Sequence, residues 1–197
     1  MSDDRDAGLP PLSVAEKVAA ILARSEVDSV LIGAAALAAH RYPRSTADID
    51  LAVGMEPRRL GEIAQELRRE GFTVEVSEPD SIDPLGGVIR ASIEGADPIE
   101  IVNFCNPPGS GFPALIEIAL RDATVVRPGA MLRVVTLPHL ILFKLYAGGS
   151  KSKSDVLELL SRNLDRVDIA ALRDACRRFR MDRRFDAWLR ELNQPDD

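Results

Sequence analysis

Two aspartates, Asp48 and Asp50, stand two positions apart at the start of the run Asp-Ile-Asp-Leu-Ala-Val. Side chains alternate between the two faces of a β-strand, so a strand here places both carboxylates on one face and Ile49 and Leu51 on the other. Two carboxylates held close together repel each other unless a cation or a proton lies between them. The pair is therefore the first candidate for a metal site.

Gly33 lies fifteen residues before Asp48, between a predicted strand and a short alanine-rich helix. Backbone N–H groups at such a turn bind anions, and glycine lets a phosphate approach closely. A glycine in this place also serves as a plain turn. The turn and the aspartate pair together suit phosphoryl transfer, in which a metal bridges phosphate oxygens and the protein positions and neutralises charge.

Glu100 is the one charged residue in the run Ile-Glu-Ile-Val-Asn-Phe, which predicts a second strand. A carboxylate is unfavourable in a core, so Glu100 lies either on an exposed face or in a site. In a site, it can act as a further metal ligand or as the base that polarises an attacking hydroxyl.

Three of the four lysines, Lys144, Lys151 and Lys153, fall within ten positions, although arginine is otherwise the common cation of this chain. An ammonium is a compact charge that suits a phosphate oxygen, while the alternative is a solvated loop that happens to hold lysines. Arg44 is a further phosphate candidate. The Ser45 hydroxyl suits either a phosphate or the loop backbone, as does that of Thr46, for which we favour the backbone role.

The segment Arg44-Ser45-Thr46-Ala47-Asp48-Ile49-Asp50-Leu51, with Gly33 and the helix after it, resembles the signature of the DNA polymerase beta-like nucleotidyltransferase superfamily. Within it, the chain is most similar to the AbiEii-like abortive-infection and toxin branch. That branch has an acidic residue in a later strand, and Glu100 matches it. Two further helical patterns of the branch are matched by Leu140, Lys144, Leu145 and Ala147, and by Lys151 with Asp155.

The resemblance covers roughly residues 27–160 and implies transfer of a nucleoside monophosphate from an NTP such as ATP. It implies two Mg²⁺ ions on Asp48 and Asp50, with Glu100 as the further ligand or the base that activates an acceptor hydroxyl. The implied phosphate contacts are Gly33, Ala34, Arg44, Ser45, Lys144 and Lys151, with Asp155 orienting a lysine.

Three residues depart from the pattern of the family. Ala34 stands where glycine or serine is usual, Glu100 where aspartate is usual, and Ser152 where an acidic residue is usual. A carboxylate displaced by about 1 Å can cost about a hundredfold in rate. A degenerate protein that binds nucleotide or a partner without turnover therefore remains an alternative.

For the acceptor, the branch favours RNA, such as a tRNA end, in a toxin-antitoxin or phage-defence role with an antitoxin protein as possible partner. The run 173–184 holds six arginines and two aspartates, which suits either a nucleic-acid backbone or a solvated helix face. A small-molecule acceptor such as an antibiotic stays open.

Composition sets the remaining bounds. The 197 residues are 46% hydrophobic, which suffices for a core, and the net charge of −6 argues against a general nucleic-acid binder. The start of the chain is acidic, no apolar run is long enough to cross a membrane, and the two cysteines lack metal-ligand spacing. These features predict a cytoplasmic protein with no membrane partner. His40 and His139 lack a partner pattern and are interpreted as structural.

The hydrophobic pattern predicts an α/β (α+β) fold with a short mixed sheet flanked by helices, followed by a C-terminal helical region. The resemblance implies that the part with the sheet is a nucleotidyltransferase core. We expect a flexible tail at 1–12, the core at 13–136, the helical region that completes the cleft at 137–193, and a frayed end at 194–197. Ser13 and Glu16 predict a capping box for the first helix. Predicted strands are 27–32, 48–53, 72–76, 88–93, 99–104, 123–126 and 132–135, and predicted helices besides the short one after Gly33 are 13–24, 56–70, 112–120, 138–147, 154–162, 168–179 and 182–192.

Overall fold

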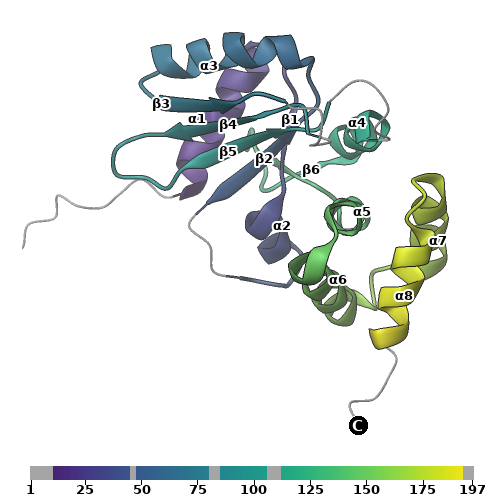
Figure 1. The fold of residues 1–197 in the computed structure, drawn as a ribbon. Coiled ribbons are helices and arrows are strands. Elements are labelled where there is room, and N and C mark those ends of the chain that lie inside the picture. The colour runs from purple at the N-terminus through teal and green to yellow at the C-terminus, as the bar shows by residue number, and fades with distance from the viewer. Residues whose placement is uncertain (1–10, 45–47, 80–84, 106–111, 193–197) are drawn as a thin grey trace, which may run out of the picture.

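A computed structural model of the chain describes residues 11–44, 48–79, 85–105 and 112–192. The strands in these ranges form one mixed sheet of seven strands (Figure 1). In chain order they are β1 (Ser29–Leu31), β2 (Ile49–Val53), β3 (Thr73–Ser77), β4 (Val88–Ser92), β5 (Ile99–Asn103), β6 (Thr124–Val125) and β7 (Arg133–Val134). The order across the sheet is β3-β4-β5-β2-β1-β7-β6.

The central strands pair in both directions. β2 runs parallel to β5 and antiparallel to β1, and β4 runs antiparallel to β5. The alternation predicted for β2 is present, since Ile49, Leu51 and Val53 are buried while Asp50 is only half-buried. The mixed sheet and the helical C-terminal region confirm the predicted fold class.

The first four helices pack against the sheet. They are α1 (Pro11–Arg24), α2 (Gly33–Ala39), α3 (Leu60–Arg69, after a 3-10 turn at Pro57–Arg59) and α4 (Phe112–Asp122). α1 and α3 lie against each other and cover β3, β4 and β5, whereas α2 lies against β2 near α5 (Figure 1).

The C-terminal region consists of α5 (Leu137–Ala147), α6 (Gly149–Asn163), α7 (Ile169–Arg178) and α8 (Asp182–Leu192). α5 is apolar around most of its circumference, as expected for a helix buried between the sheet and α6. Gly148 and Gly149 both have positive φ, at +67° and +75°, which lets α5 end and α6 begin without a loop. α7 and α8 pack on each other farther from the sheet (Figure 1).

Two of the differences between predicted and observed helix boundaries bear on predicted features. α1 begins at Pro11, so Ser13 lies inside the helix, not at the predicted capping position, and residues 11–12 are helical rather than part of a tail. α6 begins at Gly149, five residues before the predicted start, so its lysines stand on the first turns of a helix. Most of the two predicted tails, together with Ser45 and Thr46, lies outside the described residues.

Among the described residues, none of the helices combines the length and the apolar character needed to cross a membrane.

Candidate active site

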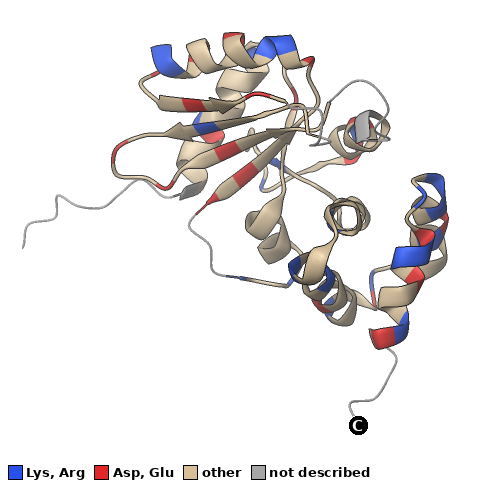
Figure 2. Ribbon diagram, viewed as in Figure 1, with Lys and Arg blue, Asp and Glu red and all other residues tan. Residues whose placement is uncertain are grey.

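The structure brings the predicted carboxylates together at the start of β2. Asp50 on β2 is paired in register with Glu100 on β5, and Asp48 directly precedes β2. Figure 2 shows the resulting red segments side by side on these two strands. The neighbours of Glu100 in β5, Ile99 and Ile101, are fully buried, so the carboxylate projects from the opposite face, as predicted.

Gly33 makes room for one of these carboxylates. A Cβ atom built on Gly33 would lie 1.7 Å from Oδ2 of Asp50, and the φ of +59° at this residue already favours glycine. The N–H of Ile32 also donates to the carbonyl oxygen of Asp50 at 2.9 Å. The glycine that the sequence pointed to as a phosphate contact is therefore needed first to seat Asp50. Ala34, the next residue, is buried.

The electrostatics of the site converge on Asp50. Burial first, and then the negative charges of Glu100 and Asp48, raise the pKa of this carboxyl group from 3.8 to about 6. Lys144 and Lys151 oppose the shift. The charges that act on Asp50 thus come from Asp48 just before β2, Glu100 on β5, Lys144 on α5 and Lys151 on α6.

Arg90 is a member of this site that the sequence reading missed. It lies on β4 in register with Glu100 and donates from Nη1 to Oε1 of Glu100 at 2.6 Å, while its Nη2 is 3.5 Å from Oδ1 of Asp48. A signal was available, because Arg90 is the charged residue between the apolar Ile89 and Ala91, and the turn at 94–98 folds its strand back beside Glu100.

A second charge cluster lies on the helical side and is centred on Asp155 of α6. This carboxylate is 1% exposed and accepts from Nζ of Lys144 at 2.7 Å and from Nη1 of Arg44 at 3.0 Å. It joins α6, α5 and the segment that leads into β2. Asp155 thereby fixes Arg44 and Lys144, and the charge of Lys144 also acts on Asp50.

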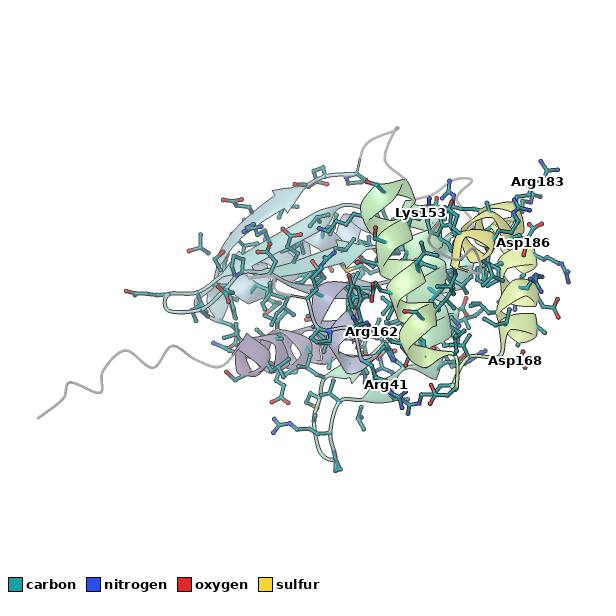
Figure 3. The ribbon with its side chains drawn as sticks, turned by 90° about the horizontal axis from the view of Figure 1, so that it is seen from below. Arg41, Lys153, Arg162, Asp168, Arg183 and Asp186 are labelled. Atoms are coloured by element: carbon teal, nitrogen blue, oxygen red, sulfur yellow. The ribbon has the colours of Figure 1, made fainter. Side chains whose placement is uncertain are left out.

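The other predicted positions are less engaged. Lys151 is exposed on the first turn of α6, and Ser152 beside it is half-buried. Lys153 forms an ion pair with Glu191 of α8 at 2.5 Å and is turned to the C-terminal helices (Figure 3). Ser45 lies outside the described residues.

A magnesium ion suits the carboxylate side of the site in one particular way. Within the described ranges, no three His, Cys, Asp or Glu side chains are grouped so that they could hold a metal together. Mg²⁺ commonly binds through one or two carboxylates together with substrate phosphates and water. Asp50, with its pKa raised beside two further carboxylates, and Asp48 on the same face supply such a donor pair.

The histidines and cysteines have other surroundings. The Nε2 of His40 is 2.7 Å from the carbonyl oxygen of Val135, and burial lowers the pKa of His40. His139 is hydrogen-bonded to the hydroxyl of Thr136, and burial lowers its pKa as well. Cys176 is buried and its pKa is raised to about 12, which disfavours the reactive thiolate.

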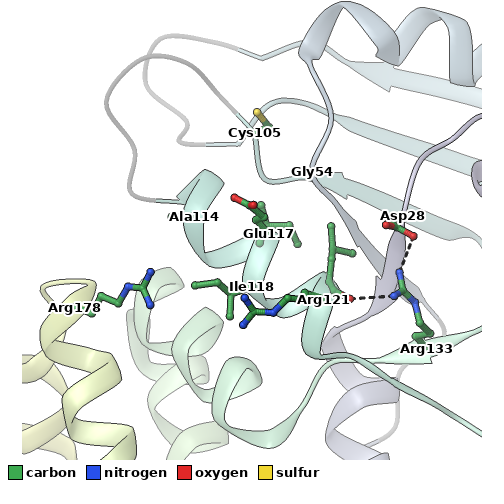
Figure 4. A pocket seen from close by; sticks show the side chains of 11 residues that line it. Asp28, Gly54, Cys105, Ala114, Glu117, Ile118, Arg121, Arg133 and Arg178 are labelled. Atoms are coloured by element: carbon green, nitrogen blue, oxygen red, sulfur yellow. Dashed lines mark hydrogen bonds and ion pairs between the residues drawn. The ribbon is translucent and has the colours of Figure 1, made fainter.

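A cavity of about 740 Å³ lies elsewhere, at the end of β2 opposite to the carboxylates (Figure 4). It is lined by Asp28, Gly54 and residues of α4, and Arg178 reaches it from α7. Asp28 in this cavity is already paired with Arg133 at 2.9 Å. The chemistry of the carboxylates and lysines does not involve this cavity.

Solved structures share the fold. The solution structure of the antibiotic-resistance factor ANT(2'')-Ia matches with a TM-score of 0.50 and 18% identity, over 91% of this chain and 95% of the other. TM1012 from Thermotoga maritima, considered a nucleotidyltransferase, matches with a TM-score of 0.50 and 17% identity, over 76% of this chain and 92% of that one.

No protein-family model and no curated protein matches the sequence. At the identities of the two structural matches, the likeness concerns the fold. This likeness to a nucleotidyltransferase structure agrees with the resemblance noted in the sequence around Asp48 and Asp50. The chain therefore shares the fold of these two solved structures.

Proposed function

We propose that the protein is a metal-dependent nucleotidyltransferase that transfers a nucleoside monophosphate from an NTP to an acceptor hydroxyl. The observation that carries the proposal is the grouping of Asp48, Asp50 and Glu100 near the starts of β2 and β5, where the charges of Lys144 and Lys151 also act on Asp50. Anionic metal ligands beside cations for phosphate oxygens are what this reaction requires.

In this proposal Asp48 and Asp50 hold Mg²⁺, together with the triphosphate; two ions are expected from the resemblance. Bound by these residues, the metal would neutralise phosphate charge and make the α-phosphorus more open to attack. Glu100 accepts the proton of the acceptor hydroxyl. The new bond joins the acceptor oxygen to the α-phosphorus, the bond from this phosphorus to the bridging oxygen breaks, and pyrophosphate leaves.

The helical region supplies the phosphate side. Lys144 and Arg44 are positioned by the buried Asp155, so their charges are oriented before the nucleotide arrives, which reduces the cost of ordering them. The side chain of Lys151 is exposed, so it can change conformation to contact the phosphates. These contributions from α5 and α6 support the proposal that residues 137–193 complete the cleft of a core formed by residues 13–136.

Two acceptors enter the proposal. The AbiEii-like resemblance favours RNA, such as a tRNA end, in a toxin-like role with an antitoxin partner. Several arginines of the run 173–184 have local partners, however: Arg173 pairs with Asp186, Arg177 with Asp174, and Arg184 donates to the carbonyl oxygen of Leu145. Arg183 remains exposed and points outward (Figure 3).

A small-molecule acceptor such as an antibiotic is the second candidate. It is favoured by the match to the antibiotic-resistance factor ANT(2'')-Ia, which extends over 95% of that protein. A protein that binds nucleotide without turnover is the competing class, and the contacts of Arg90 with two of the three carboxylates favour it.

The test is incubation of the full chain with Mg²⁺ and each α-labelled NTP, together with total RNA, purified tRNA or a panel of hydroxyl-bearing antibiotics. Label in one acceptor class identifies the substrate. The matched variants are Asp48→Asn, Asp50→Asn and Asp28→Asn, the last changing a carboxylate at the opposite end of the sheet.

Loss of labelling in the first two variants with retention in the third supports the assignment. Binding of Mg-NTP without transfer to any acceptor, to the protein itself or to water points to the nucleotide-binding class. Absence of both binding and transfer contradicts the proposal.

A further inference from the structure

Arg90 lies beside the carboxylate group and contacts two of its members, Asp48 and Glu100. Register across three adjacent strands places Asp50 beside Glu100 and Glu100 beside Arg90, so one row of the sheet carries two negative charges followed by a positive one. Asp48, one residue before β2, completes the group.

The guanidinium of Arg90 divides its donors between two carboxylates from different strands. Nη1 donates to Glu100 at 2.6 Å, and Nη2 lies 3.5 Å from Asp48. The planar fork of arginine suits such divided contacts, because its N–H groups point in fixed directions. One positive charge therefore offsets the repulsion between carboxylates that otherwise face each other without compensation.

We propose that Arg90 is an internal counter-ion that takes the place of the metal in the nucleotide-free protein and must leave Asp48 and Glu100 before a divalent cation binds there. The inference rests on the proposed function, because it takes the carboxylates to be the metal site. It accounts for the finding that the described residues contain no ready three-ligand cluster even though three carboxylates lie close together.

The exposure of the group makes such an exchange accessible. The side chains of Arg90, Asp48 and Glu100 are 40%, 44% and 32% exposed. Ion pairs with this access to water are weak and are readily broken. A guanidinium on a long flexible side chain can swing into solvent without any movement of the strand that carries it.

The experiment measures Mn²⁺ binding to the metal-free, nucleotide-free full chain by electron paramagnetic resonance. Arg90→Met removes the counter-ion and keeps the aliphatic length of the side chain. Arg133→Met is the matched control, because it removes a strand arginine paired with Asp28 at the other end of the same sheet. Loss of a competing surface ion pair predicts that Arg90→Met binds Mn²⁺ roughly fivefold more tightly than the natural protein, whereas Arg133→Met is unchanged.

Arg90→Lys provides a second variant should the methionine variant fail to fold. Its charge is kept but its fork is lost, so its Mn²⁺ affinity should lie between those of the natural protein and Arg90→Met. Adding Glu100→Gln to either variant should reverse the gain.

The remaining outcomes overturn the inference in distinguishable ways. Equal Mn²⁺ affinity with and without Arg90 shows that no competition exists and leaves the proposed function intact. Weaker binding in both Arg90 variants shows that Arg90 holds the ligands in place. If neither the natural protein nor any variant binds Mn²⁺, with or without NTP, the metal-dependent function fails as well.

Discussion

The two charge clusters of the site are opposites in composition and in surroundings. Around Asp155, one buried carboxylate holds two cations, Lys144 and Arg44. Around Arg90, one partly exposed cation contacts two carboxylates, Asp48 and Glu100. Charge interactions are strong where water is excluded and weak where it is admitted. In the proposed function, the first cluster forms the phosphate side of the site, which is held fixed, and the second forms the metal side, which would exchange its counter-ion for the metal.

The first way to break this comparison is Asp155→Ala. Removal of the buried carboxylate leaves Lys144 and Arg44 without their partner while they are largely enclosed, so we expect the free energy of unfolding to fall by about 2–4 kcal/mol. Urea denaturation at neutral pH measures it. Asp155→Asn keeps the shape and the acceptor oxygen, so it should recover part of the loss. A loss below about 0.5 kcal/mol would show that Asp155 behaves like an ordinary surface carboxylate.

Gly33→Ala tests how tightly the metal side is seated. The new Cβ would meet Asp50 Oδ2 at 1.7 Å and would place alanine at a φ of +59°. We expect a destabilisation of about 2 kcal/mol from strain and displacement and about a hundredfold loss of transfer activity.

The control for backbone strain alone is Gly129→Ala, because Gly129 has a φ of +78° and no atom within 4 Å of an added Cβ. We expect the free energy of unfolding of Gly129→Ala to fall by about 1 kcal/mol and its transfer activity to be unchanged. Equal activity loss in both variants would remove the special role of Gly33.

The aspartate pair and Glu100 were within reach of sequence reasoning because strand alternation dictates which face a residue occupies. Hydrophobic periodicity likewise predicted the helix at 138–147, which corresponds to α5. These features depend on residues close together in the chain, whose conformations follow from local sterics and hydrophobic pattern.

What the sequence did not reveal depends on contacts between distant segments. Arg90 became part of the site only through the register of β4 on β5, and Gly33 approaches Asp50 only because α2 packs on β2. The link from Arg44 to Asp155 spans 111 residues. No periodicity encodes such a contact, since it is set by how whole elements pack.

Asp50→Asn sharpens the comparison through pH. The pKa of Asp50 is raised from 3.8 to about 6 in the folded protein, so between these values the folded state binds more protons than the unfolded state. Stability of the metal-free protein therefore falls as pH rises through this window, and the penalty is complete above it. Asparagine removes the penalty.

We expect Asp50→Asn in EDTA to be about 1–2 kcal/mol more stable than the natural protein at pH 7 and no more stable near pH 3.5. Denaturation curves over this pH range measure the difference. A gain of equal size at both pH values would trace the effect to packing instead of charge, and a loss at pH 7 would contradict the raised pKa.

The smallest effect on stability is expected for Lys151→Ala. Lys151 is exposed on the first turn of α6, so its removal should change the free energy of unfolding by less than about 0.5 kcal/mol. Its charge nevertheless acts on Asp50, which places it near the nucleotide of the proposed reaction. We expect the KM for Mg-NTP to rise about fivefold with kcat little changed, because the lysine attracts the phosphates in the ground state and the transition state alike.

Lys153→Ala is the matched control, since Lys153 is paired with Glu191 and should leave KM unaltered. Similar KM values for the two variants would show that Lys151 does not contact the nucleotide. The phosphate contacts would then come from Lys144 and Arg44 alone, and the nucleotide would lie at the cluster around Asp155.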